Sequence, residues 1–552
     1  MSTLNLDILH EIMDKVAEPK AKSTILLNLS LTCRQARESI KPILFRKVKW
    51  PHLDKFDEKS GLHFFPEVLW TCFRTFHLDW PDNWFDPSPP LWGSTPRAMC
   101  YPMYLARLED ALPRMTSIHT VQITCPFDPP SNLLAIIAKC PNIKDFRITD
   151  TPLCTPVLPL LSDNFNLEHM TITSVAEVVR MGEGPFEKRY RNMVYFMRDY
   201  RRKYLDGSVD DDAHYNARRF FTAFCRKEVL QSLQISANFI RLFIHEFWNN
   251  DTLCPCLRTL ILTGATPAYF IDLSKWVINR MPKLTDLRVL LSPKKISGSQ
   301  PEHERFSMIA HPEWHEGPGS PKAYSQITSL AISNAYNTRR ILRYTNRLKR
   351  LAICALVSPP RRSIALLGVE IKHLLFDLEA GGGNKHLQQI RLISEESLDA
   401  TFLALLGRIC PKLEIVEVEQ CGYQDTWRED DWDAYGDTLL ANFPRIRKLR
   451  LAIQFHGCAE LKHEHAQNNY YSEFDNLACI QEQRLPCATY LASRVPTLQN
   501  IGFEYRWRMS RHEDRWLDFD ILRLEGGDVR LVDINPTWYQ FPEIWEPVPL
   551  LD

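Results

Sequence analysis

Apolar and polar positions recur in one order along most of the chain. A helical stretch ends at a residue usually followed by proline, a leucine or isoleucine comes shortly after it, and an alternating apolar strand follows. Clear copies begin at Cys140, Cys254, Met281, Asn346, Cys410, Phe443 and Val495, and weaker copies lie at 112–123, 165–172, 327–332, 371–376 and 387–392. Because proline neither continues a helix nor donates to a sheet ladder, the pattern predicts a turn before each strand.

Repetition of this unit indicates how the units are arranged. One strand and one helix cannot bury an apolar side, whereas stacked copies form a continuous core. The Leu-x-x-Leu-x-Leu core resembles that of leucine-rich repeats, but the copies lie roughly 20 to 50 residues apart, against about 20–29 in that class. We expect an α/β fold, namely an irregular leucine-rich-repeat solenoid with a curved parallel sheet and outer helices. The alternative is an ordinary α/β sheet, which offers no reason for the signature to repeat.

The first fifty residues follow a different pattern. Apolar residues at 8, 9, 12, 13 and 16 form one helical stripe that ends before Pro19. A second helix is expected from Ser23 or Thr24, and a third is expected to break near 39–41 because of Pro42. Three short helices in so small a segment cannot bury all their apolar residues internally, so the module is expected to complete its core against a partner.

This segment resembles an F-box, the adaptor-docking module of modular ubiquitin ligases. The resemblance lies in the runs at 4–12, 29–34 and 43–48, which are similar to the F-boxes of fungal F-box proteins. Asn5 stands where that family usually has proline. It implies a three-helix F-box whose contacts to a Skp1-like adaptor come from Leu4, Ile8, Leu9, Ile12, Leu31 and Cys33. The alternative is a helical cap on the repeats that follow.

These patterns divide the chain into four regions. Residues 1–50 form the F-box, 51–104 an aromatic and proline-rich linker with the first repeat, 105–505 the solenoid with a helical insertion at 175–230, and 506–552 a C-terminal cap with a hairpin at 522–532. The stretch 180–228 interleaves basic and aromatic residues. That composition fits either an inserted helical hairpin or a nucleic-acid-binding segment.

Composition narrows the class of protein. The 67 basic and 67 acidic residues cancel, which gives no electrostatic footprint for nucleic acid or an anionic membrane. The sequence has neither a secretory signal nor an apolar run of about 18 residues. The 15 cysteines are odd in number and scattered, as in proteins of a reducing compartment. We therefore expect a cytoplasmic or nuclear protein.

Candidate catalytic and metal-binding residues are few. The His463–His465 pair, the Cys254–Cys256 pair and the group of His303, His311 and His315 lack the ligand spacing of known metal sites. Cys33 and Cys410 lie in apolar surroundings that favour an inert thiol. No nucleotide-binding or serine-hydrolase motif is present. We expect neither an enzyme nor a cofactor.

The two halves together suggest a recruiter. The resemblance implies a substrate-recognition subunit of an SCF-type (Skp1-cullin-F-box) E3 ubiquitin ligase, in which the F-box binds the adaptor and the solenoid binds a target protein. Candidate target contacts on the strand face are Arg258, Arg288, Arg391, Glu417 and Arg450. Two alternatives remain: a leucine-rich-repeat protein-binding scaffold without a ubiquitin role, and an RNA-binding or enzymatic solenoid based on the basic stretch.

Overall fold

The structure is a computed structural model of all 552 residues. It describes residues 19–32, 34–49, 67–79, 106, 108–124, 131–149, 166–173, 228–236, 254–265, 280–292, 324–333, 339–354, 368–394, 399–420, 426–427, 431–451, 454–455, 473–506, 514–533, 537–539, 545 and 547–549. Within these ranges it is a mixed α/β fold built on an 18-stranded, mostly parallel sheet.

The parallel strands follow one another in chain order. They are β1 (Lys47–Lys49), β2 (Thr75–Asp79), β3 (Thr120–Thr124), β4 (Asp145–Thr149), β5 (His169–Ile172), β6 (Ser232–Ser236), β7 (Thr259–Ala265), β8 (Asp286–Ser292), β9 (Ser329–Ser333), β10 (Arg350–Cys354), β11 (Gln389–Ser394), β12 (Ile415–Gln420), β14 (Lys448–Leu451) and β16 (Asn500–Arg506). Each one pairs in parallel with the next of this series. This regular advance is solenoid-like and differs from a doubly wound sheet, whose strand order reverses.

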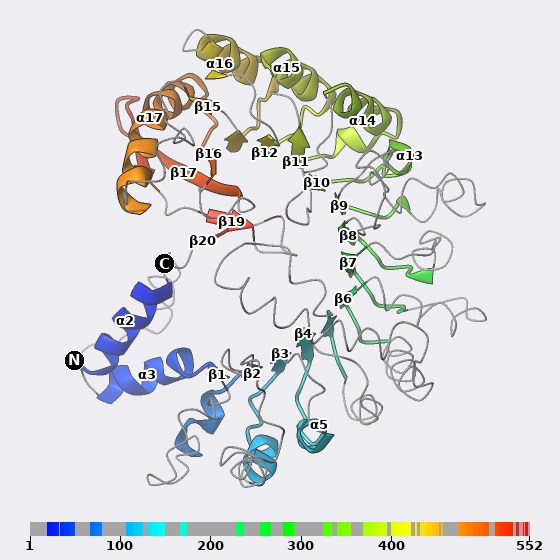
Figure 1. Cartoon of the computed structure of the whole chain (residues 1–552), viewed down its shortest axis with the longest axis vertical. Helices are drawn as coiled ribbons and strands as arrows, with labels where there is room; N and C mark the ends of the chain where they lie inside the picture. Colours follow the sequence, from blue (N-terminus) through cyan, green and yellow to red (C-terminus); the bar gives the residue numbers. More distant parts are fainter. Residues whose placement is uncertain are drawn as a thin grey trace, which may run out of the picture.

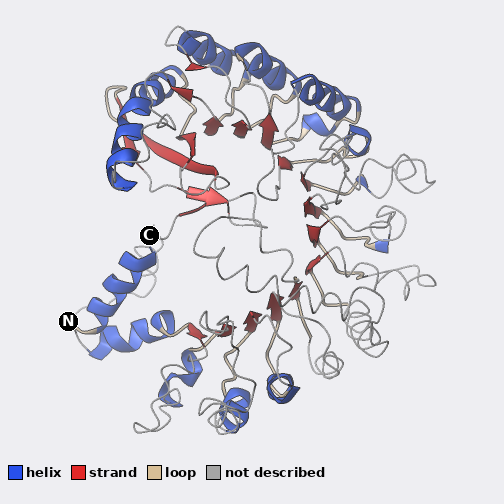
Figure 2. Cartoon of the chain, viewed as in Figure 1, coloured by secondary structure: helices blue, strands red, loops and turns tan. Residues whose placement is uncertain are grey.

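Helices lie outside the curve that the strands make. They are α5 (Ser131–Ala138), α13 (Arg339–Leu342), α14 (Gly368–Ala380), α15 (Ala400–Ile409), α16 (Asp431–Asn442) and α17 (Glu473–Arg494), with short 3-10 turns η2 (Glu67–Cys72), η4 (Leu112–Arg114) and η10 (Gly383–Lys385). Figure 1 shows the strands lining the inner side of an open ring and α14 to α17 along its outer side. Figure 2 shows the same separation by element type. No helix among the described residues has the length and apolar character needed to cross a membrane.

Alternation along each strand separates the two faces of the sheet. The second residue of every parallel strand points into the layer between sheet and helices, where Val48, Phe76, Phe146, Leu351 and Ile501 are each at most 4% exposed. These positions are in register across the pairings, so the strands form one continuous apolar column. The column belongs to one core cluster that runs from β1 to β17. Stacking therefore buries what no single repeat could bury.

The proline-containing segment before the strands forms the expected turn. The Leu257 N–H donates to the Cys254 carbonyl at 3.0 Å, and the Leu498 N–H donates to the Val495 carbonyl at 3.1 Å. All four residues are buried, so each turn is closed by a hydrogen bond and fixed by two apolar anchors. Proline at the second position of such a turn has its φ preset. The recurring signature is thus a turn that starts each strand.

A column of carbonyl groups joins consecutive coils at the start of the strands. The Arg258 carbonyl, for example, accepts both the Thr285 and Asp286 N–H groups at 2.9 Å. The residues whose carbonyls accept two such bonds are Arg46, Arg74, His119, Lys144, Glu168, Gln231, Arg258, Thr285, Thr328, Lys349, Gln388, Glu414 and Arg447. Because their backbone is used in the ladder and their side chains are polar, this edge of the sheet is hydrophilic.

Most predicted strands are confirmed, and two predictions need correction. The weak copy at 371–376 lies in helix α14, where Ile371, Leu374 and Leu375 face the core at helical spacing. Strand β6 was not among the predicted copies, although Leu230, Leu233 and Ile235 have the spacing of the repeat core.

The C-terminal end reverses strand direction. Strand β17 (Asp514–Arg523) pairs antiparallel with β16, and β18 (Val529–Asp533), β19 (Thr537–Tyr539) and β20 (Pro547–Pro549) continue the antiparallel pairing. The hairpin expected at 522–532 is confirmed, with Gly526 and Gly527 at φ values of 110° and 91° that favour glycine. A separate two-stranded sheet joins β13 (Thr426–Trp427) to β15 (Gln454–Phe455).

Candidate functional site

Two helices precede the sheet and pack on each other. They are α2 (Pro19–Ser30) and α3 (Arg34–Leu44), and Leu26 and Ile40 form the centre of a small core with Leu29, Ile43 and Leu44. The turn between them is held by Thr32 Oγ1, which donates to the Leu29 carbonyl at 2.7 Å. This small core is distinct from the main core of the sheet among the described residues.

The predicted break in the third helix is wrong. Helix α3 continues through Pro42 to Leu44. Pro42 stands in the last turn, where the missing N–H removes a single intrahelical bond, and the Phe45 N–H still donates to the Lys41 carbonyl at 2.9 Å. A proline in the last turn of a helix is thus accommodated, and the helix ends two residues after it.

Apolar side chains stand exposed on and beside this helical pair. Their exposed fractions are 38% for Ile25, 53% for Leu27, 66% for Leu31 and 38% for Phe45. Of the predicted adaptor contacts, Leu31 is therefore accessible. Leu4, Ile8, Leu9, Ile12 and Cys33, together with the predicted first helix, lie outside the described residues. The helices also lead directly into β1, whose Val48 belongs to the main core.

The predicted target contacts occupy different environments. Arg258 is exposed but lies on the carbonyl column just before β7. Arg288, on the inner face of β8, is 15% exposed and its guanidinium is 2.9 Å from the Asp286 carboxylate. Arg391, Glu417 and Arg450 are buried on the inner face of β11, β12 and β14. That these five contact a target stays a prediction, and for the buried three the described structure presents no open surface.

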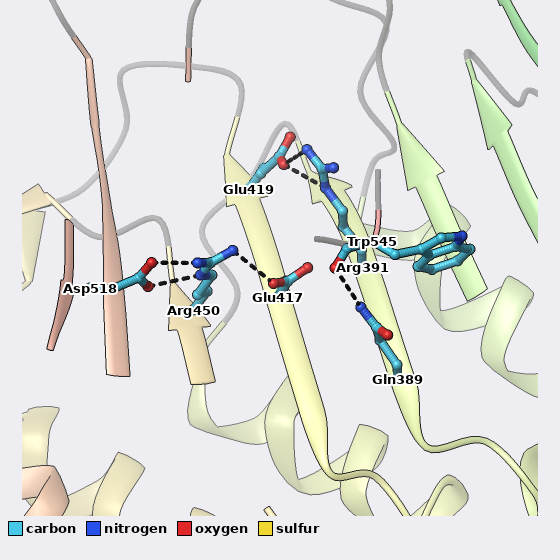
Figure 3. A network of polar contacts seen from close by, with 7 residues as sticks. All are labelled: Gln389, Arg391, Glu417, Glu419, Arg450, Asp518 and Trp545. Carbon is cyan, nitrogen blue, oxygen red and sulfur yellow. Dashed lines mark hydrogen bonds and ion pairs between the residues drawn. The ribbon is translucent and has the colours of Figure 1, made fainter. Parts of the chain in front are cut away.

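Arg450 is the centre of a buried network of charges on the inner face (Figure 3). Its Nε donates to Asp518 Oδ1 at 2.8 Å, a second nitrogen bonds Asp518 Oδ2, and a third lies 3.1 Å from Glu417 Oε1. Its guanidinium also lies 5.4 Å from the ring centroid of Trp516. Arg450 is thereby ion-paired on two sides, as a charge without exposure to water requires.

Neighbouring charges extend this network along the sheet. Arg391 donates to Glu419 from Nε at 2.7 Å, and both side chains are at most 9% exposed. Burial, with a smaller contribution from the Arg450 charge, lowers the pKa of Lys448. Asp518, Glu419 and Trp516 were not singled out from the sequence. Glu417 and Glu419 alternate with Val416 and Val418, and this alternation, which placed Glu417 on the inner face, would also have placed Glu419 there.

An apolar patch lies on the inner face of strands β7 to β10, around Arg288. It consists of Ile261, Leu290, Ala331, Ala352 and Cys354 on β7 to β10, and Trp545 from the C-terminal end packs with it. This cluster lies on the opposite side of the sheet from the main core. No periodicity marks Trp545 in the sequence, so its position could not be predicted.

Metal and thiol chemistry find little support among the described residues. No group of three potential ligands lies close enough to hold a metal ion in the described ranges. The histidines at 303, 311, 315, 463 and 465 lie outside them. Cys410 is buried, as its apolar surroundings in the sequence predicted, and burial raises the pKa of its thiol to about 12. Cys256 is half-buried, and its sulfur lies 3.4 Å from Lys283 Nζ.

Comparison with known proteins gives a distant structural similarity. No protein-family model and no curated protein matches the sequence. A chain in the crystal structure of the Rad7 and Elc1 complex from yeast is similar at a TM-score of 0.30 and 13% sequence identity, over 58% of this chain and 76% of that chain. A similarity at this score assigns no function. The proposal below therefore rests on the surfaces described above.

Proposed function

We propose that this chain is the substrate-recognition subunit of an SCF-type E3 ubiquitin ligase. The N-terminal helices bind a Skp1-like adaptor, and the solenoid, a degenerate leucine-rich-repeat array, binds a target protein. The chain itself is non-catalytic and acts by positioning. It raises the effective concentration of target lysines at a ubiquitin-conjugating enzyme carried by a cullin-RING ligase.

One observation supports this proposal most. Leu31, which the F-box resemblance assigns to the adaptor, is 66% exposed, and Leu27 and Ile25 nearby are exposed as well. The small core of α2 and α3 is separate from the main core, so these side chains are not needed to join the helices to the sheet. Leu27 and Leu31 are four residues apart, so they lie toward one side of the helical pair, and exposed apolar side chains of this kind are typical of a protein-binding surface.

Co-purification with a Skp1-like adaptor tests the proposal. We expect the wild type to retain the adaptor and Leu31→Asp to weaken it by at least about tenfold, or about 1.4 kcal/mol, because a buried contact would gain an unpaired charge. Val369→Asp is the matched control, since Val369 is 55% exposed on α14, away from the helical pair. Failure of the wild type to retain the adaptor would contradict the proposal. An equal loss of adaptor binding in Leu31→Asp and Val369→Asp would show that the surface around Leu31 is not the binding site.

A second candidate is a protein-binding scaffold with no ubiquitin role, in which α2 and α3 cap the array. The direct continuation of α3 into β1, which pairs with β2, favours it. Removal of residues 1–45 separates the two, because it leaves β1 in place. If the chain is a receptor, the truncated chain should stay folded and no longer bind the adaptor. If α2 and α3 are a cap, the β1 end of the array should unfold.

A further inference from the structure

The apolar patch on the inner face has an unusual composition for its place. Four paired residues form one row across strands β8 to β11. In this row Arg288 of β8 and Arg391 of β11 lie on either side of two alanines, Ala331 of β9 and Ala352 of β10. Two small side chains between two long ones leave room above the sheet. In the next inward-facing row, Leu290 and Cys354 are buried in the same cluster, and Ser333 is the partner of Cys354 on β9.

The chain's own Trp545 fills this room. Its side chain is 7% exposed and belongs to the same cluster as the patch. The Arg350 guanidinium lies 5.2 Å from the indole centroid, and Gln389 Nε2 donates to the Trp545 carbonyl at 3.5 Å. Figure 3 shows the indole beside the strand that carries Gln389 and Arg391. The site thus holds an aromatic ring by apolar contact and by a cation over its face.

Two features indicate that this occupant is replaceable. The indole Nε1–H is buried without a hydrogen-bond acceptor among the described residues, so the fit leaves one polar group unsatisfied. The segment is anchored by the short pairing of β20 with β19, and β19 in turn pairs with β17 at only Arg515 and Trp516. A partner segment that places its own tryptophan on the patch and makes further contacts beyond it can compete with a segment held by so few pairings.

Charge indicates which ligands fit. Arg350, on the rim of the patch, has a 42% exposed side chain and lies 3.7 Å from Asp286. Arg288 lies two strands away on β8 and pairs with the same Asp286, so two arginines share one carboxylate at this rim. In the sequence Trp545 is flanked by Glu543 and Glu546 and followed by Pro547. A partner segment with acidic residues close to its tryptophan in sequence would complement the positive charge of this rim.

We propose that the apolar patch is the target-binding site of the solenoid and that it takes a tryptophan side chain from an acidic, extended segment of a partner protein. The Trp545 segment is a built-in competitor that covers the site until a partner displaces it. This inference deepens the proposed function by assigning the target site. Its test contains no adaptor, so its failure and the failure of adaptor docking are distinguishable.

A labelled peptide with the sequence of residues 541–549, Phe-Pro-Glu-Ile-Trp-Glu-Pro-Val-Pro, is the probe. Fluorescence anisotropy compares its binding to the full-length wild type and to Trp545→Ala. We expect Trp545→Ala to bind at least about tenfold more tightly, since its patch is uncovered. Binding should fall at least about tenfold when the peptide's tryptophan is replaced by alanine, or when Ala352→Leu fills the patch of Trp545→Ala. Equal binding by wild type and Trp545→Ala, or by both peptides, would overturn the proposal.

A second measurement uses the wild type alone. Excess unlabelled peptide should speed hydrogen–deuterium exchange of residues 537–549, because the displaced segment loses its pairing, while exchange in β16 stays unchanged. Unchanged exchange at 537–549 contradicts displacement. Unfolding of Trp545→Ala would also overturn the proposal, since the segment would then be a structural part of the core.

Discussion

Arg450 and Asp518 form an ion pair across an intervening strand. Arg450 is on β14 and Asp518 on β17, with β16 between them. The pair forms because Gly502 of β16 has no side chain, and a Cβ there would lie 2.2 Å from Asp518 Oδ1 and 3.0 Å from Arg450 Cγ. Besides the backbone pairing of β16 with β17, an ion pair that passes over Gly502 therefore links the last parallel strands to the antiparallel cap.

Gly502→Ala should therefore destabilise the cap. The added methyl group displaces Asp518 from Arg450, and we expect a loss of about 2 kcal/mol or more from overpacking and a weakened buried pair. Chemical denaturation followed by circular dichroism measures it. Gly436→Ala in α16 is the control, because its nearest neighbour is the exposed, flexible Arg494 side chain, and we expect a change within about 1 kcal/mol. Equal effects would show that the close approach at Gly502 is unimportant.

Arg450→Met should cost more than loss of one hydrogen bond. It leaves Glu417 and Asp518, which are 1% and 2% exposed, without their shared cation. Breaking a buried pair by removing one partner typically costs about 3–5 kcal/mol. Denaturation of Arg450→Met against the exposed-site variant Arg347→Met measures the difference. If Asp518→Leu added to Arg450→Met fails to restore any stability, repulsion between the Glu417 and Asp518 carboxylates is not the cause.

Leu351→Ala tests the continuous apolar column. Leu351 is fully buried, and truncation at such sites costs about 2–5 kcal/mol. Because coils contact their neighbours, faster hydrogen–deuterium exchange should appear first in β9 to β11 rather than throughout. Leu440→Ala, at a site 47% exposed on α16, should change stability by about 0.5 kcal/mol or less. A uniform loss of protection over all strands would contradict the solenoid-like arrangement.

The buried thiols predict a loss of stability at high pH. Burial raises the pKa of the Cys487 thiol to about 12, above its unfolded value near 9.0. Between these pH values the unfolded chain releases the proton and the folded chain keeps it, so stability falls as pH rises. In Cys487→Ala the slope of unfolding free energy against pH should become flatter by up to about 1.4 kcal/mol per pH unit.

Denaturation at pH 8 to 10.5 measures that slope. Leu491→Val is the control, because it loosens the same helix without removing a titrating group and should lower stability at every pH with the slope unchanged. An unchanged slope in Cys487→Ala would mean that this thiol titrates alike in both states.

Much of the sheet was predictable from the sequence because the repeat has a local cause. The proline turn at Cys254 and Val495 specifies where a strand begins, and alternation specifies which residues face the core. Prediction of a strand from this pattern failed at two places in the chain. Residues 371–376 have apolar spacing that fits a helix as well. Strand β6 was missed although its segment has the apolar spacing of the repeat core.

The inner face was harder to predict, because its contacts are distant in sequence. Alternation placed Arg391, Glu417 and Arg450 on that face, but their burial depends on Asp518 and on the charges beside them. Trp545 reaches β10 and β11 from the far end of the chain without any local pattern. A strand pattern therefore identifies a face but not what covers it.

Hydrogen–deuterium exchange of the full chain, with and without a purified Skp1-like adaptor, tests the central claim most directly. Adaptor binding should slow exchange in α2, the turn at Leu31 and α3, which carry the exposed apolar side chains, and leave α14 with its exposed Val369 unchanged. Leu27→Asp combined with Leu31→Asp should abolish that protection. Protection confined to other coils, or no protection by saturating adaptor, would contradict the account.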